Sequence, residues 1–206
     1  SVTYDRQAPT LSDVSISTNN TNSAFAKEGS IITLAFTAAN TENLLADPTV
    51  TILGNNADAV SGSGASWTAT YTALETDTEG TVPFTIDFFD YSGNAGTRVT
   101  AIMDGDDVIF DMSKPTLATA SITSSNDNAP TGTLAKVGDV ITVTITATND
   151  EGLREPEITI AGNDAIIAGN EGQPTFTATY QMQSSDATAD AIAFTVDFLD
   201  LAGNAG

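Results

Sequence analysis

The feature that most constrains this chain is that one sequence pattern occurs twice along it. "FTIDFFDYSGNAG" at 84–96 returns as "FTVDFLDLAGNAG" at 194–206, and "AKEGSIITLAFTA" at 26–38 returns as "AKVGDVITVTITA" at 135–147. Shorter matches, such as the recurring "TATY", keep the same order in both halves. Because repetition at a fixed period is typical of tandem structural units, the chain is predicted to fold as two copies of one domain.

The repeat period sets the expected domain boundaries. Asp5 of "DRQAPTL" matches Asp111 of "DMSKPTL", an offset of 106, and the offset grows only slightly along the repeat. A unit of about a hundred residues is an ordinary domain size. We therefore expect one domain at 5–110 and a second at 111–206, while residues 1–4 belong to the terminal strand of a preceding repeat.

Hydrophobic and polar residues alternate in both units, which is the period of a β-strand with one buried face. The clearest runs are Ile32, Leu34, Phe36 and Ala38 in the first unit and Ile141, Val143, Ile145 and Ala147 in the second. Clusters of Gly, Asn, Asp and Ser separate the runs, as turns require. About seven short strands per hundred residues is typical of an immunoglobulin-like sandwich. The predicted fold class is all-β, with two tandem immunoglobulin-like β-sandwich domains and Trp67 in a core.

Composition limits the chemistry that the chain can carry out. It contains no Cys and no His, so it lacks disulfides, thiol nucleophiles, imidazole bases and the commonest zinc ligands. Its 27 acidic and 6 basic residues give a formal net charge of −21, which repels nucleic acid and anionic membranes and attracts cations. No apolar run is long enough to span a bilayer. The prediction is a protein that is not an enzyme and that neither binds nucleic acid nor inserts into a membrane.

The ordered motifs "PTL", "AK.G..IT", "GN", "TATY" and "D..GNAG" resemble the bacterial immunoglobulin-like repeats of large cell-surface adhesins and related extracellular repeat proteins. The resemblance covers nearly the whole chain. It implies a secreted or cell-surface location, neighbouring repeats of the same protein as partners, and a role as a spacer that carries a terminal binding domain away from the cell. Several relatives bind calcium at domain junctions, so the resemblance also implies calcium as a cofactor.

Oxygen-bearing side chains are expected to gather at the N-terminal end of each sandwich. The candidate calcium ligands are Asp111, Asp150, Glu151, Asp200 and Asn204 in the second unit and Asp5, Glu42, Asp90 and Asn94 in the first. Calcium takes six to eight oxygen ligands, which such a set can provide. An Asp with Gly and Asn three and four residues later is equally typical of a turn in which the carboxylate accepts hydrogen bonds from backbone N–H groups. Both interpretations of Asp90 and Asp200 stay open at this point.

Other acidic residues have simpler predicted roles. Asp87 and Asp197 lie one pleat before the loop aspartates, on outward strand positions, and are predicted to be solvated. Glu75, Asp77 and Glu79 are expected to place negative charge at the opposite end of the first sandwich, near the junction with the second.

An adhesive module that binds carbohydrate or protein is one alternative function. Carbohydrate-binding modules stack sugars on exposed aromatic rings, for which Phe89 and Tyr91 are candidates. Their counterparts in the second unit are Leu199 and Leu201, which cannot stack in that way.

Strand donation is a second alternative. "VTYD" at 2–5 matches "VIFD" at 108–111, and no counterpart of "VIFD" follows residue 206 in this sequence. The second sandwich is therefore expected to lack its final strand or strands. Either a longer polypeptide continues beyond this point, or Val2, Thr3 and Tyr4 of another molecule complete the sandwich. The second possibility predicts head-to-tail self-association into filaments.

Overall fold

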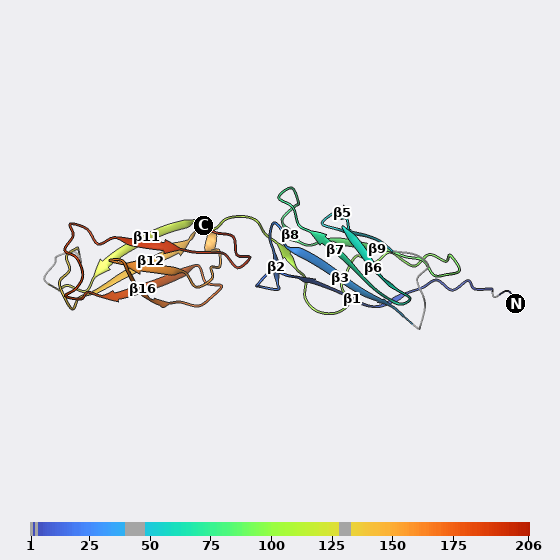
Figure 1. The fold of residues 1–206 in the computed structure, drawn as a ribbon, viewed down its shortest axis with the longest axis horizontal. Coiled ribbons are helices and arrows are strands. Elements are labelled where there is room, and N and C mark those ends of the chain that lie inside the picture. Colours follow the sequence, from blue (N-terminus) through green and yellow to red (C-terminus); the bar gives the residue numbers. More distant parts are fainter. Residues whose placement is uncertain (1, 3, 40–47, 128–132) are drawn as a thin grey trace. The chain divides into compact units, whose positions relative to one another are not determined.

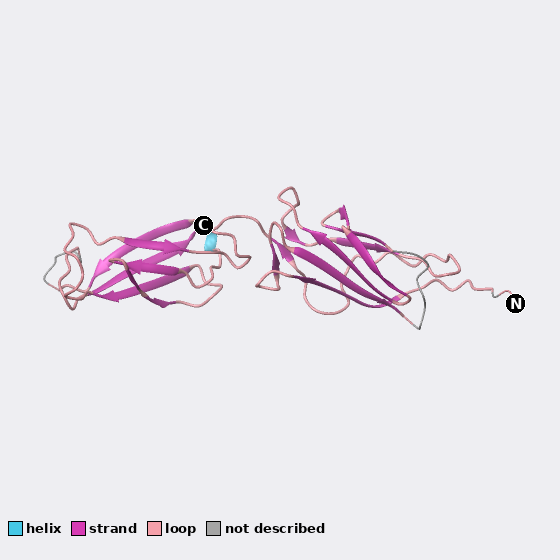
Figure 2. Ribbon diagram, in the orientation of Figure 1, coloured by secondary structure: helices cyan, strands magenta, loops and turns pink. Residues whose placement is uncertain are grey.

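The structure is a computed structural model that describes residue 2 and residues 4–39, 48–127 and 133–206. The chain divides into two compact units, Ser1–Met112 (unit 1) and Ser113–Gly206 (unit 2). The described residues are almost entirely strands, turns and loops, as Figures 1 and 2 show. The expectation of an all-β chain is therefore confirmed. The domain boundary predicted from the sequence lies between residues 110 and 111. The boundary between the two compact units lies between residues 112 and 113.

In the part of unit 1 that the structure describes, the strands form two main sheets and one small sheet. The four-stranded sheet has the order β1 (Leu11–Thr18), β3 (Ile31–Ala38), β7 (Ser66–Thr72), β6 (Ala59–Ser63). The first three-stranded sheet has the order β5 (Asn55–Asn56), β4 (Thr49–Ile52), β9 (Phe84–Asp87). The small sheet has the order β2 (Phe25–Ala26), β10 (Ile109–Phe110), β8 (Gly80–Thr81).

The core of unit 1 is formed by the strand faces whose burial the alternating pattern predicts. Along β3 the even-numbered residues are buried, and Phe36 pairs with Trp67 on β7. Trp67 is 6% exposed and its Nε1 donates a hydrogen bond to the Gly64 carbonyl at 3.1 Å, so its predicted place in the core is confirmed. The inward residues of β4 and β9 belong to the same hydrophobic cluster. Two facing sheets that share one core are consistent with a β-sandwich.

Strand β10 closes one side of unit 1. It runs parallel to β2 and antiparallel to β8, and Phe110 within it is fully buried. Earlier in the same segment, the Val99 and Ile86 amides each donate to the carbonyl of the other residue, at 3.1 and 2.9 Å, which extends the sheet beyond β9. The segment after β9 therefore covers an edge that would otherwise be exposed.

Unit 2 repeats the two main sheets. Its four-stranded sheet has the order β11 (Leu117–Ser124), β12 (Val140–Ala147), β16 (Thr175–Gln181), β15 (Ile166–Ala168). Its three-stranded sheet has the order β14 (Asn163–Asp164), β13 (Glu157–Ile160), β17 (Phe194–Asp197). A 3₁₀ turn, η1 (Thr148–Asp150), follows β12. The alternation predicted for β12 is confirmed, since Ile141, Val143, Ile145 and Ala147 are all buried in the second hydrophobic cluster.

A cluster of hydrogen-bonded polar side chains recurs in both units, and in unit 1 it contains a buried aspartate. Asp77 is 7% exposed, and its carboxylate accepts hydrogen bonds from Asn55 Nδ2 (2.8 Å), the Tyr71 hydroxyl (3.1 Å) and the Leu74 amide (2.8 Å). Burial, then the hydrogen bond to Asp77 and its charge, raise the pKa of Tyr71. The sequence analysis predicted only that Asp77 adds negative charge at this end of unit 1, and it did not predict the burial or the hydrogen bonds of this carboxylate. Asp77 is an internal acceptor that fixes a turn against β7.

Unit 2 contains the equivalent cluster. Asp186 accepts from the Tyr180 hydroxyl at 3.1 Å, from Asn163 Nδ2 at 3.3 Å and from the Gln183 amide at 2.7 Å. Burial, then the hydrogen bond and charge of Asp186, raise the pKa of Tyr180. The cluster is thus part of the repeated framework and not a feature of one unit.

Asp87 is partly exposed, and it forms a surface ion pair that the sequence analysis did not predict. Its two carboxylate oxygens accept from Nε and an Nη of Arg98, both at 2.8 Å. Because the pair lies on the surface, its contribution to stability is small. Asp197, its counterpart, is exposed as predicted and lies directly opposite Glu157 in the β13–β17 ladder.

Candidate functional site

In unit 1 the loop at residues 90–94 is built around the buried carboxylate of Asp90. Asp90 is 1% exposed. Its Oδ1 accepts from the amides of Ser92 and Asn94, both at 2.8 Å, and its Oδ2 accepts from Asn94 Nδ2 at 2.8 Å. Gly93 takes a φ of 86°, a left-handed conformation that favours glycine. This loop is a turn whose backbone donors converge on one aspartate.

The loop at residues 200–204 in unit 2 has the same construction. Asp200 is 1% exposed, and its Oδ1 accepts from the amides of Gly203 (2.6 Å) and Asn204 (2.8 Å). Its Oδ2 accepts from Asn204 Nδ2 at 2.8 Å. The turn interpretation of these two aspartates is thus correct as a description of their local contacts.

The capping bonds leave each buried aspartate with limited capacity for a cation. A carboxylate oxygen accepts at about two positions. Oδ1 of Asp200 uses both within unit 2, whereas Oδ2 accepts only from Asn204 there. Asp90 has the same distribution of bonds. Oδ2 of Asp200 therefore keeps one acceptor position within unit 2.

The Asp90 turn predicts an acid-dependent loss of stability in unit 1. Burial alone would raise the pKa of Asp90, but hydrogen bonds from Asn94, Ser92 and Gly93 outweigh it and lower the pKa from its ordinary 3.8. A carboxyl with a lower pKa in the folded state stabilises fully above its ordinary pKa and loses that contribution as pH falls through its folded pKa. We expect unit 1 to melt at a nearly constant temperature above about pH 5 and at falling temperatures below about pH 4.

The measurement uses Trp67, the single tryptophan of the chain, as a fluorescent probe of unit 1. Asp90→Asn cannot titrate in this range, so its melting temperature should change less steeply between about pH 5 and pH 3 than that of the unaltered protein. Parallel curves for the two proteins would show that Asp90 is not responsible.

Asp5 lies against the Asp90 loop within unit 1. Its Oδ2 accepts from the Ser92 hydroxyl at 3.2 Å, and its Oδ1 accepts from the Gln7 amide at 2.9 Å. The structure therefore brings Asp5 to the same loop as Asp90 and Asn94. Glu42, the fourth predicted ligand of this unit, lies outside the described residues.

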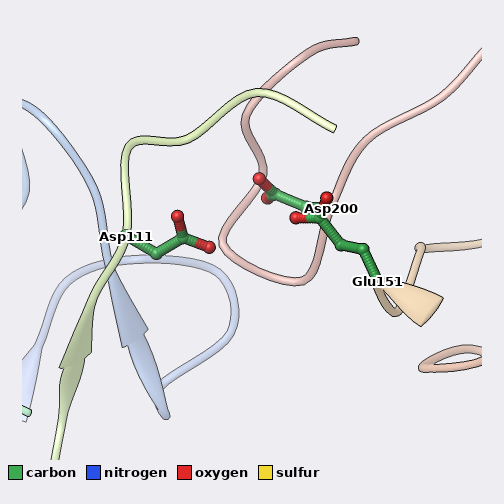
Figure 3. A group of neighbouring side chains, drawn as sticks. All are labelled: Asp111, Glu151 and Asp200. Carbon is green, nitrogen blue, oxygen red and sulfur yellow. The ribbon is translucent and has the colours of Figure 1, made fainter. Parts of the chain in front are cut away.

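In unit 2 the structure brings Glu151 to the Asp200 loop. One carboxylate oxygen of Glu151 and one of Asp200 lie within 4.8 Å of each other (Figure 3). Glu151 follows η1, where Asn149 has a positive φ of 58° that turns the chain after β12. Leu153 then pairs with Asp200 in an isolated bridge, which holds the two segments side by side. Figure 3 also labels Asp111, the last residue but one of unit 1. The side chain of Asp150 lies outside the described set.

Arg154 is a residue at this loop that the sequence analysis missed. Its amide donates to the Leu199 carbonyl at 2.9 Å, and an Nη donates to the Leu201 carbonyl at 3.4 Å. Its Nε is buried and has no hydrogen-bond partner among the described residues. A positive charge therefore flanks the Asp200 loop. One basic residue beside an acidic loop was visible in the sequence, but its contact partners were not.

The aromatic residues beside Asp90 are exposed. Phe89 is 50% and Tyr91 is 62% exposed, on either side of the buried aspartate. Their counterparts Leu199 and Leu201 are partly buried. In the part of the chain that the structure describes, no helix has the length and apolar character needed to cross a membrane.

No protein family matches the chain, and no curated protein matches it. Among solved structures, it is similar to SGBP-B of the Bacteroides ovatus mixed-linkage glucan utilization locus, solved in complex with a mixed-linkage heptasaccharide. The sequence identity is 13% and the TM-score is 0.21, and the match covers 86% of this chain and 51% of that one. The chain thus spans about half the length of that structure. A similarity at this level assigns neither fold nor function.

Proposed function

We propose that this chain is a non-enzymatic spacer: two immunoglobulin-like repeats from the extracellular part of a bacterial surface protein, stiffened by calcium. The observation that carries the proposal is the repetition of one framework in both units, including the aspartate turn and the Asn–Tyr–Asp cluster. A catalytic or receptor-binding domain needs its special residues only once. A repeated framework with repeated turns favours a structural role.

The calcium part of the proposal assigns Glu151 and Asp200 as ligands within unit 2. Glu151 supplies a carboxylate close to Asp200, whose Oδ2 retains an acceptor position beside its turn. Hard carboxylate and carbonyl oxygens are the ligands that calcium prefers, and backbone carbonyls and water would complete its shell.

Calcium is expected to raise the melting temperature of unit 2. A ligand that binds only the folded state stabilises it by mass action. With a dissociation constant of about 0.1 mM, an ordinary value for extracellular modules, about 1 mM calcium stabilises by roughly 1.4 kcal/mol. This corresponds to roughly 5–10 °C for a domain of this size. Differential scanning calorimetry with calcium and with a chelator measures the shift.

Glu151→Gln is the matched variant for this experiment, because it removes a charge without altering the Asp200 turn. It should melt like the unaltered protein in chelator and lose the calcium shift. Identical curves with calcium and chelator for the unaltered protein would refute the calcium site. In that case the calcium part of the proposal is refuted. The spacer part still rests on the repeated framework.

An adhesive carbohydrate-binding module is the second candidate, favoured by the exposed rings of Phe89 and Tyr91. A spacer should give no signal on a glycan array. Robust binding to one glycan class that is lost in a Phe89→Ala, Tyr91→Ala double variant would contradict the spacer proposal and establish the adhesive one.

A further inference from the structure

Residues 99–108 of unit 1 form a segment, the strap, that connects its two main sheets. Val99 bridges to β9 at the edge of the three-stranded sheet. The amides of Met103 and Asp104 then both donate to the Val14 carbonyl in β1, at 2.8 and 3.3 Å. At its end, Val108 accepts a hydrogen bond at 2.9 Å from the residue that follows β8. The strap therefore crosses from one main sheet to the other and is attached to both.

The strap packs inward at its two ends and is exposed between them. Val99 and Ile102 are partly buried against the core of unit 1, and Val108 is buried. Residues 103–107 are all exposed. β1 is an edge strand of the four-stranded sheet, and the two amides of the strap cover this edge at Val14. An edge of the sandwich is thus covered by a short stretch of exposed backbone.

The exposed part of the strap contains a reactive dipeptide. Asp104 followed by Gly105 is the only Asp-Gly pair in the sequence, which contains no Asn-Gly pair. The amide nitrogen after an aspartate can reach the carboxyl carbon of that aspartate and close a five-membered ring. A side chain on the following residue obstructs this approach, and glycine has none. A Cβ placed on Gly105 would meet no atom within 4 Å, so the surroundings do not obstruct the approach either.

The Asp104 carboxylate is not held in place by hydrogen bonds. It accepts none from any described residue, and the Gly105 amide donates none to them. The carboxylates of Asp90 and Asp200 differ, because backbone and side-chain N–H groups hold each of them in a buried turn. The Asp104 side chain therefore has the freedom to turn toward the next amide, which ring closure requires.

We propose that Asp104 is a site of spontaneous isomerisation to isoaspartate and that this modification releases the strap from β1. The Gly105 nitrogen attacks Cγ of Asp104. The N–Cγ bond forms, the nitrogen loses its proton, and one carboxyl oxygen leaves as water, which gives a cyclic succinimide. Water then adds to the ring carbonyl next to Cα and breaks its bond to nitrogen. The main chain now runs through Cβ and Cγ. Water is the co-reactant, and nothing is oxidised or reduced.

The modification acts at the attachment of the strap to β1. Isoaspartate lengthens the main chain by one carbon atom between the Asp104 amide, which donates to Val14, and Val108, which is held beside β8. It also places a free carboxylate on Cα of residue 104, next to the amide that donates to the Val14 carbonyl. Negative charge beside a carbonyl oxygen is repelled. Both changes weaken the hydrogen bonds that cover the edge of β1.

The first test detects the modification in the folded, full chain. The protein is incubated in mildly acidic buffer below its melting transition, and isoaspartate is then measured with a carboxyl methyltransferase specific for it and by chromatography of proteolytic fragments. Isoaspartate should accumulate at Asp104. Asp106 and Asp107 lie in the same exposed loop but precede residues that carry side chains, so they should form at least about tenfold less. No isoaspartate, or equal amounts at all three positions, would overturn the proposal.

Asp104→Glu is the matched variant for this test. It keeps the negative charge, but its longer side chain would have to close a six-membered ring, which forms more slowly. Methyl incorporation should therefore fall to the background of the freshly purified protein. Asp106→Glu, two residues along the same loop, should incorporate as much as the unaltered chain. Undiminished incorporation in Asp104→Glu would place the reaction at another residue and contradict the proposal.

The second test measures release of the strap in the isomerised fraction after chromatographic separation. The Met103 amide should exchange its hydrogen at least about tenfold faster than in fresh protein. Unit 1, followed by Trp67 fluorescence, should melt roughly 4–8 °C lower, while unit 2 is unchanged. Asp104→Glu incubated for the same time should melt like its fresh sample. Isoaspartate at residue 104 with unaltered exchange and melting would show that the modification does not release the strap.

Discussion

Phe36→Ala is expected to lower the melting temperature of unit 1 by roughly 15–30 °C and to leave unit 2 unchanged. Phe36 is 2% exposed and pairs with Trp67 across the β3–β7 ladder. Truncating a buried phenylalanine costs about 3–5 kcal/mol, because the cavity adds to the lost burial. In a domain of about a hundred residues each kcal/mol moves the melting temperature by roughly 4–8 °C. Trp67 fluorescence reports the transition.

Phe176→Ala is the reciprocal variant, since Phe176 takes the place of Trp67 in unit 2 and is 1% exposed. It should shift a calorimetric transition without moving the Trp67 fluorescence transition, because the two hydrophobic clusters share no residue. Leu74→Ala and Ile166→Ala, at positions 50% and 76% exposed, serve as surface controls. A single transition that moves equally in both variants would contradict independent cores.

Asp200→Ala is expected to destabilise unit 2 by about 2–3 kcal/mol, or roughly 10–20 °C, even in chelator. The substitution leaves two backbone amides and the Asn204 amide group without their acceptor in a buried turn. The loss should therefore not depend on calcium. Calorimetry in chelator measures it, with unit 1 as an internal reference through Trp67 fluorescence.

Asp197→Asn is the control for this prediction. Asp197 is exposed and lies opposite Glu157, so removing its charge relieves repulsion and should leave unit 2 equally or slightly more stable. If Asp200→Ala destabilised unit 2 only when calcium was present, the turn role of Asp200 would be wrong and its role as a ligand would dominate.

The strands were largely predictable because their signal is local. Alternation along 31–38 and 140–147 marks the buried face residue by residue, and the structure confirms it. Asp90 and Asp200 occupy matching positions of the repeat, and each accepts a hydrogen bond from the side-chain amide of the Asn four residues later.

The contacts that the sequence analysis missed depend on residues far apart in the chain. Asp77 lies in a turn cluster, where an aspartate is exposed by default, and one of its hydrogen-bond donors, Asn55, is 22 residues away. Arg154 reaches Leu201 across 47 residues. Neither pair of residues belongs to a regular spacing or a repeated pattern in the sequence. Only the folded structure therefore reveals that they are in contact.

The ladder geometry of unit 1 has a mechanical consequence. β1 starts at the entry of the unit and pairs with β3 from Leu11 to Thr18, whereas β10 lies beside β2 near the exit. A force that pulls residues 5 and 111 apart slides β1 along β3 and β10 along its neighbours. Many hydrogen bonds then carry the load at once and do not open one after another. Forced unfolding is governed by the unfolding rate, and hydrogen bonds that must break together make that rate slow. We therefore expect a unit of this kind to extend little under tension before it unfolds.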